Sequence, residues 1–246
     1  MLGELTMSMT TDRPSRPGPE ASVNGTAKVA EELDAVSIAD RWAADYAERL
    51  RAATQERLAA RSGGANSLLP AIGAPIVGPY VAFDIAMTSP LQFGGPPPYQ
   101  PSKVIAAGEP AFIFAFLFVN PTVDVGNGFA VPPTVQLSGR EYRMRLEQVN
   151  LSTVANVPGQ TKPGTFSSPA DFLTVETFKL ATPDPGANPA LIEANVTVDV
   201  VGFAQPYAAF ATTFFDFDGD PGSLFVPPET PGWRRDLPNR YLVYSE

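Results

Sequence analysis

The sequence contains neither cysteine nor histidine. Without cysteine the chain cannot form a disulfide, a thiolate nucleophile or a zinc–thiolate site. Without histidine it lacks the commonest metal ligand and the commonest general base near neutral pH, so a histidine-based catalytic triad is excluded as well. Any chemistry must therefore rest on carboxylates, lysine, arginine, serine, threonine or tyrosine.

Basic residues are also scarce. The 246 residues include 17 Lys and Arg against 26 Asp and Glu, which gives a formal net charge of -9. Nucleic-acid binding normally requires a basic surface that displaces counterions from phosphates, so we expect no nucleic-acid partner. The hydrophobic share of 44% is nevertheless large enough to build a core in a chain of this length.

Long apolar runs are missing too. The longest, Ala111–Val119, has about half the length that a membrane-spanning helix needs. The first twenty residues carry neither the basic nor the apolar region of a secretion signal. We therefore expect a cytoplasmic protein as the default, or one that reaches another compartment by a different route, and we do not expect it to bind membranes.

Changes in composition along the chain predict four segments. Residues 1–26 are rich in Pro, Ser, Thr and Gly and predict a disordered tail. Residues 27–62 contain no proline or glycine and predict an amphipathic helix. Residues 63–79 predict a Pro/Gly-rich connector. The uncharged connector favours an extended segment over the core, with a membrane or partner contact as the alternative. Residues 80–246 predict one β-domain, and the absence of a repeat of fixed period excludes propellers and solenoids.

The predicted helix carries one apolar stripe with large side chains at four-residue spacing. Its members are Ile38, Trp42, Tyr46 and Leu50. Leaving this stripe in water would be costly, so it packs either on the protein's own sheet or on the same helix of another subunit. We take these four residues as a candidate interaction surface. Ser37 and Asp40 resemble a capping box, and a second helix start near Val36 is therefore one interpretation.

Alternation of apolar and polar residues predicts three half-buried strands, at Val81–Met87, Glu141–Val149 and Ile192–Val200. Ala111–Val119 is apolar on both faces and predicts a central strand. Further candidate strands are Val104–Ala106, Thr134–Leu137, Phe172–Leu180, Tyr207–Phe217, Leu224–Val226 and Tyr241–Tyr244. Turn-rich segments separate them, among them VPGQTKPG at 157–164. This pattern predicts a mainly β fold, an antiparallel β-sandwich or jelly roll, preceded by the amphipathic helix.

One acidic loop resembles a metal site. Asp216, Asp218 and Asp220 alternate with other residues, and oxygen ligands at this spacing converge on a hard cation such as calcium when the chain curls. The loop departs from the EF-hand pattern, because Pro221 replaces the required glycine and Pro227 replaces the twelfth-position glutamate. The two interpretations are a calcium loop of another type and an acidic, solvated turn. Apart from this calcium, we expect no cofactor.

Three functions are compatible with these observations. The leading hypothesis is a non-enzymatic structural or protein-interaction protein, a self-associating component of a larger assembly that uses the helix to reach a partner. The alternative is a calcium-assisted module that binds carbohydrate or another surface through the 216–220 loop. The third is a hydrolase that uses two distant carboxylates, for which Glu141 and Asp199 are an example of a pair.

Overall fold

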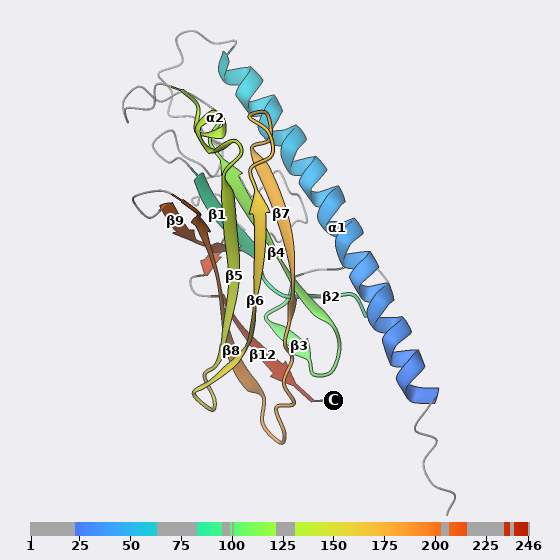
Figure 1. Ribbon diagram of the computed structural model, residues 1–246. Helices are drawn as coiled ribbons and strands as arrows, with labels where there is room; N and C mark the ends of the chain where they lie inside the picture. Colours follow the sequence, from blue (N-terminus) through green and yellow to red (C-terminus); the bar gives the residue numbers. More distant parts are fainter. Residues whose placement is uncertain are drawn as a thin grey trace, which may run out of the picture.

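The computed structural model describes residues 23–62, 83–94, 99, 101–121, 131–202, 207–215, 234–236 and 239–245. In this part the chain forms two β-sheets and a long amino-terminal helix (Figure 1). The predicted mainly β fold with a preceding helix is thus confirmed. The predicted connector 63–79, the predicted strand Leu224–Val226 and the predicted tail up to residue 22 lie outside the described residues.

The first sheet is centred on β4 (Ala111–Val119). One edge of β4 pairs antiparallel with β1 (Phe83–Thr88) and β2 (Leu91–Gln92), and the other pairs antiparallel with β7 (Leu173–Leu180). Beyond β1 follow the parallel neighbour β10 and then β11, whose bounds are Thr212–Phe215 and Arg234–Asp236. The central position predicted for the run of apolar residues is therefore correct.

The second sheet is centred on β8 and β5. Its order is β3 (Val104–Ala106), β12 (Asn239–Tyr244), β8 (Ala190–Val200), β5 (Glu141–Asn150) and β6 (Ala155–Thr165). The short strand β9 (Tyr207–Phe210) pairs with the carboxyl-terminal half of β8, beyond the part that pairs with β12. All these pairs are antiparallel except that between β3 and β12.

The two sheets are connected along both sides. On one side the chain passes from the second sheet to the first between the consecutive strands β9 and β10. The buried Ala211 lies at this crossing, and its backbone N–H donates a hydrogen bond to the Val196 carbonyl at 2.7 Å. On the other side β6 faces β7, where Lys162 forms an ion pair with Glu176 at 3.5 Å. The predicted strand over Tyr207–Phe217 is thus two strands that belong to different sheets.

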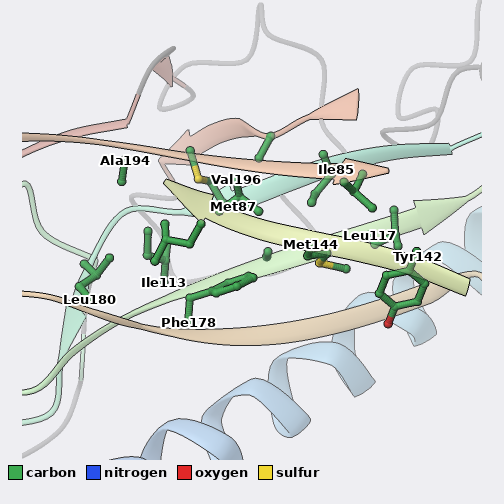
Figure 2. Packing of buried hydrophobic residues seen from close by; sticks show 14 of the residues in the cluster. Ile85, Met87, Ile113, Leu117, Tyr142, Met144, Phe178, Leu180, Ala194 and Val196 are labelled. Carbon is green, nitrogen blue, oxygen red and sulfur yellow. The ribbon is translucent and has the colours of Figure 1, made fainter. Parts of the chain in front are cut away.

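The main core lies between the inner faces of the two sheets. Along β8 every second side chain is buried, as the alternation predicted. Figure 2 shows these layers meeting, with Ile113, Leu117 and Phe178 from the first sheet and Met144 and Val196 from the second. Burial of such apolar surface provides the main driving force for folding this domain.

Helix α1 (Val23–Ser62) covers the opposite, outer face of the first sheet (Figure 1). It is continuous over 40 residues, so the helix start considered near Val36 is wrong. Ser37 and Asp40 are exposed, while Ala35 before them and Ala39 between them pack against the sheet. Because residues 27–62 also contain no proline or glycine, nothing interrupts the backbone ladder there.

Two local predictions were wrong. Thr134–Leu137 is part of the short helix α2 (Pro133–Leu137), where Pro133 takes the first turn and Thr134 and Leu137 are buried on one face. Residues 157–164, expected to form a turn, lie within strand β6. β6 is an edge strand that pairs only with β5 in the described structure, and proline is tolerated at an edge because its missing N–H is not needed there.

Candidate functional site

The contact between α1 and the first sheet is the place where the predicted interaction stripe lies. Four phenylalanines project from alternate positions of β4 toward the helix, namely Phe112, Phe114, Phe116 and Phe118. The Trp42 and Phe114 ring centroids are 4.6 Å apart, and those of Tyr46 and Phe116 are 5.2 Å apart. Trp42 also stacks on Tyr46 at 4.6 Å. The helix therefore buries an aromatic row that the core between the sheets does not reach.

Only part of the predicted stripe lies on the face of α1 that contacts the sheet. Tyr46 and Leu50 are buried, whereas Ile38 and Trp42 are half-buried along the flank. The remaining buried positions are alanines that sequence analysis did not single out: Ala39, Ala43 and Ala47. Small residues are needed there because the phenylalanines already fill the space between helix and sheet.

In the described structure these side chains pack on the protein's own sheet, the first of the two hypotheses for the stripe. Arg51 adds polar anchors at the end of this contact, since its Nη2 donates a hydrogen bond to the Leu173 carbonyl at 2.6 Å and lies 3.6 Å from Asp171. Pairing of the helix with a second subunit stays a prediction.

The predicted calcium ligands Asp216, Asp218 and Asp220 lie outside the described residues. In the part of the chain that is described, no three acidic side chains lie together in a way that could hold a metal ion. Calcium binding by the 216–220 loop therefore stays a prediction as well.

The carboxylates considered for hydrolysis lie on the outer face of the second sheet. Asp199 of β8 accepts hydrogen bonds from Arg143 of β5, with 2.6 Å to Nη2, and Arg145 lies 3.9 Å away. Glu141 is exposed two residues before Arg143, and its backbone carbonyl accepts a hydrogen bond from Val201. The structure thus places Asp199 in an ion-pair network rather than opposite Glu141 across a cleft.

Two buried tyrosines, Tyr241 and Tyr142, contribute hydroxyl groups to the interior of the domain. Tyr241 donates a hydrogen bond to Gln148 at 2.9 Å, and Gln148 donates one to the Pro158 carbonyl at 2.7 Å. Burial raises the pKa of Tyr241. Burial, followed by the charge of Glu176, raises the pKa of Tyr142 to about 12. Both phenols therefore stay protonated at neutral pH, where they serve packing and hydrogen bonding.

A cavity of about 330 Å³ opens between the amino-terminal half of α1 and the end of the first sheet. We call it the acidic aromatic cavity, and its principal lining residues are Asp34, Ile38, Phe93, Gly94, Tyr99 and Glu109. The helix supplies the first two, the segment after β2 the next three, and the turn between β3 and β4 supplies Glu109. It thus combines two aromatic rings with two carboxylates.

The cavity was not predicted from the sequence, although Ile38 belongs to the predicted stripe. Tyr99 belongs to the segment GGPPPYQP at 94–101, whose composition predicts a turn, and Phe93 directly precedes this segment. A tyrosine within a Pro/Gly-rich stretch of sequence is a weak signal, and Asp34 joins the cavity only through tertiary packing of the helix. A second cavity of about 420 Å³ lies beside it, also contacts Glu109, and is otherwise lined by small and polar residues such as Thr182, Asp184 and Ser245.

Comparisons with known proteins do not extend this description. No protein-family model matches the chain, and no curated protein matches it significantly. Among the described helices, none is both long enough and apolar enough to cross a membrane.

Proposed function

We propose that the chain is a non-enzymatic structural or protein-interaction protein that self-associates as a component of a larger assembly. In this proposal the two sheets are a β-sandwich of the jelly-roll type that forms the body, and the amino-terminal part of α1 reaches a neighbouring subunit.

The observation that supports the proposal is the length of α1 compared with its contact on the sheet. A helix of 40 residues extends over about 60 Å at 1.5 Å per residue. Its described contacts with the sheet run from Ala35 to Arg51, about 25 Å by the same rise. Figure 1 shows the helix leaning away from the sheets toward its amino-terminal end. The described contacts thus cover less than half of the length of the helix.

The contact between the middle of α1 and the protein's own sheet also supports the proposal, because it holds the amino-terminal part of the helix as a fixed arm. Trp42 and Tyr46 lie against phenylalanines of β4, and the middle of the helix is therefore fixed to the body. An arm fixed at its middle presents its amino-terminal end in a defined direction, which reduces the entropy lost on association.

Light scattering coupled to size-exclusion chromatography tests the proposal on three proteins. We expect the full chain and a chain that begins at residue 23 to form the same discrete oligomer. A chain that begins at residue 34 keeps every described contact from Ala35 onward, and we expect it to have a lower mass. The chain that begins at residue 23 is the matched control, because it loses the preceding segment and keeps the helix.

A monomeric full chain would refute the proposal, and so would an unchanged mass after removal of residues 23–33. Circular dichroism and thermal melting establish that the shortened proteins are folded. In the full chain, V29E and L33E test the same part of the helix without shortening it, and we expect each to lower the oligomer mass.

A further inference from the structure

We propose that the acidic aromatic cavity binds an organic cation, an alkyl-guanidinium or alkyl-ammonium group such as the end of an arginine or lysine side chain. This inference concerns a different surface from the amino-terminal arm, and it stands or falls independently of self-association.

Two aromatic rings form the apolar wall of the cavity. The Phe93 and Tyr99 ring centroids lie 4.9 Å apart with an interplanar angle of 82°, an edge-to-face contact. Tyr99 is only half-buried, so part of its ring is accessible to a ligand. The negative face of an aromatic ring attracts a cation within about 6 Å, and more strongly when water is excluded. Phe93 is 6% exposed and its ring packs on Phe112 at 5.7 Å, which holds the wall in place before any ligand enters.

The polar groups of the cavity are all of one sign. Asp34 on the helix and Glu109 on the turn between β3 and β4 contribute carboxylates, and no basic side chain lines the cavity in the described part of the chain. Of the ion pairs between described residues, none includes Asp34 or Glu109. A cation can therefore bind without first displacing an internal partner, whereas an anion would be repelled by both carboxylates and by the net charge of -9.

Local backbone geometry fixes the position of Glu109. Gly108 has a φ of +78°, a left-handed conformation that favours glycine, and it makes the turn that directs Glu109 to the cavity. On the opposite wall, a Cβ atom at Gly94 would lie 3.0 Å from the Glu109 Oε2 atom. Both glycines thus allow the carboxylate to lie close to the aromatic segment.

The size of the cavity selects a small ligand or a single side chain. About 330 Å³ is at the lower end of the range for small-molecule sites. Half-buried Ile38 provides an apolar contact for an alkyl stem, and the accessible part of the Tyr99 ring contacts the cationic carbon or nitrogen. The carboxylates accept its N–H hydrogen bonds. These features together match an alkyl chain that ends in a cation.

Nuclear magnetic resonance of the full-length protein tests this assignment at the site itself. The backbone amide signals of Gly94 and Gly108 are followed during titration with n-butylguanidinium and, separately, with n-butylurea, which has a similar shape and no charge. We expect saturable shifts with the cation and at least about tenfold weaker binding of the urea. Titration with acetyl-Gly-Arg-Gly-amide separates the two sources of such a cation. If the peptide binds at least as tightly as n-butylguanidinium, the cation is the side chain of a partner protein. If the peptide binds more weakly, the cation belongs to a free small molecule.

Charge-removing variants provide the matched comparison. We expect E109Q and D34N each to weaken n-butylguanidinium binding by about three- to tenfold, since each removes one charge-assisted hydrogen bond. D184N changes the net charge equally but lies in the neighbouring cavity, and we expect its binding to stay within about twofold of the unmodified protein. Three results would overturn the proposal: no saturable shift, equal binding of n-butylurea, or a loss in D184N as large as that in E109Q.

Discussion

Tyr46 of α1 lies with its ring centroid 5.2 Å from that of Phe116 in β4, and one turn earlier Trp42 lies 4.6 Å from Phe114. These pairs explain why β4 is buried on both faces. Its odd-numbered residues face the core between the sheets, whereas its even-numbered phenylalanines face the helix. The helix is therefore an integral layer of the domain, and its middle contributes to stability.

Removing the Phe116 side chain should destabilise the protein strongly. We expect Phe116→Ala to lower the free energy of unfolding by about 3 to 5 kcal/mol, because the site is fully buried and the cavity cannot be filled by water. Tyr46→Ala should also destabilise, and a double-mutant cycle measured by urea denaturation should give a coupling of about 0.5 to 1.5 kcal/mol. Strictly additive effects would contradict the ring contact.

Enlarging an alanine on the sheet-facing side of α1 should destabilise the protein. We expect Ala43→Leu to cost about 1 to 3 kcal/mol, because the additional carbons meet phenylalanines that already fill the interface. Ala44→Leu is the matched control, since Ala44 is exposed on the same helix turn and its substitution should change stability by less than about 0.5 kcal/mol. Equal effects on the urea midpoint would contradict the observed orientation of the helix.

The stability of the protein should fall above pH 10 in a way that depends on Tyr142. Its pKa is about 12 in the folded chain and close to 10 when unfolded, so between these values the folded state holds a proton that the unfolded state has lost. The free energy of unfolding then decreases with rising pH, by up to about 1.4 kcal/mol per pH unit from this group. Urea unfolding at pH 9 and pH 11 should show a smaller decrease in Tyr142→Phe. An identical decrease in both proteins would contradict this assignment.

The turn between β5 and β6 contains a strained residue. Val154 has a φ of +54° and is 87% exposed, an unfavourable conformation for a β-branched side chain without compensating burial. We expect Val154→Gly to raise the free energy of unfolding by about 0.5 to 1.5 kcal/mol. Thr153→Gly, in the same exposed turn without a positive φ, should lower it instead by about 0.5 to 1 kcal/mol. The two urea midpoints should therefore move in opposite directions.

Much of the fold could be predicted because some patterns have one physical solution. Alternation over Ile192–Val200 and the double-sided apolar run Ala111–Val119 gave the strands at the centres of both sheets. The secondary structure of short or proline-containing segments is harder to predict from the sequence. Thr134–Leu137 is too short for its periodicity to separate a strand from a helical turn, and the prolines near residue 160 are acceptable in a strand only because β6 is at an edge.

The candidate site was less predictable than the fold. The stripe through Tyr46 and Leu50 was visible from spacing, but the alanines beside it were not, because a small residue signals a close contact only when the opposite surface is known. The acidic aromatic cavity depends on Asp34 and Glu109, which are distant in sequence and meet through the packing of the helix on the first sheet. No local pattern contains that information.

The sequence by itself determined the long helix and the central strands, the alternation that assigns one face of each main strand to the core, and the exclusion of cysteine and histidine chemistry. These properties are local, since they depend on side-chain period and residue type along a few turns of chain. Only the tertiary structure decided that β9 and β10 belong to different sheets, that the helix covers the phenylalanine row, and that two carboxylates meet two rings at its edge. Those outcomes depend on which of several apolar surfaces pack together, and the hydrophobic effect that drives such packing is not directional.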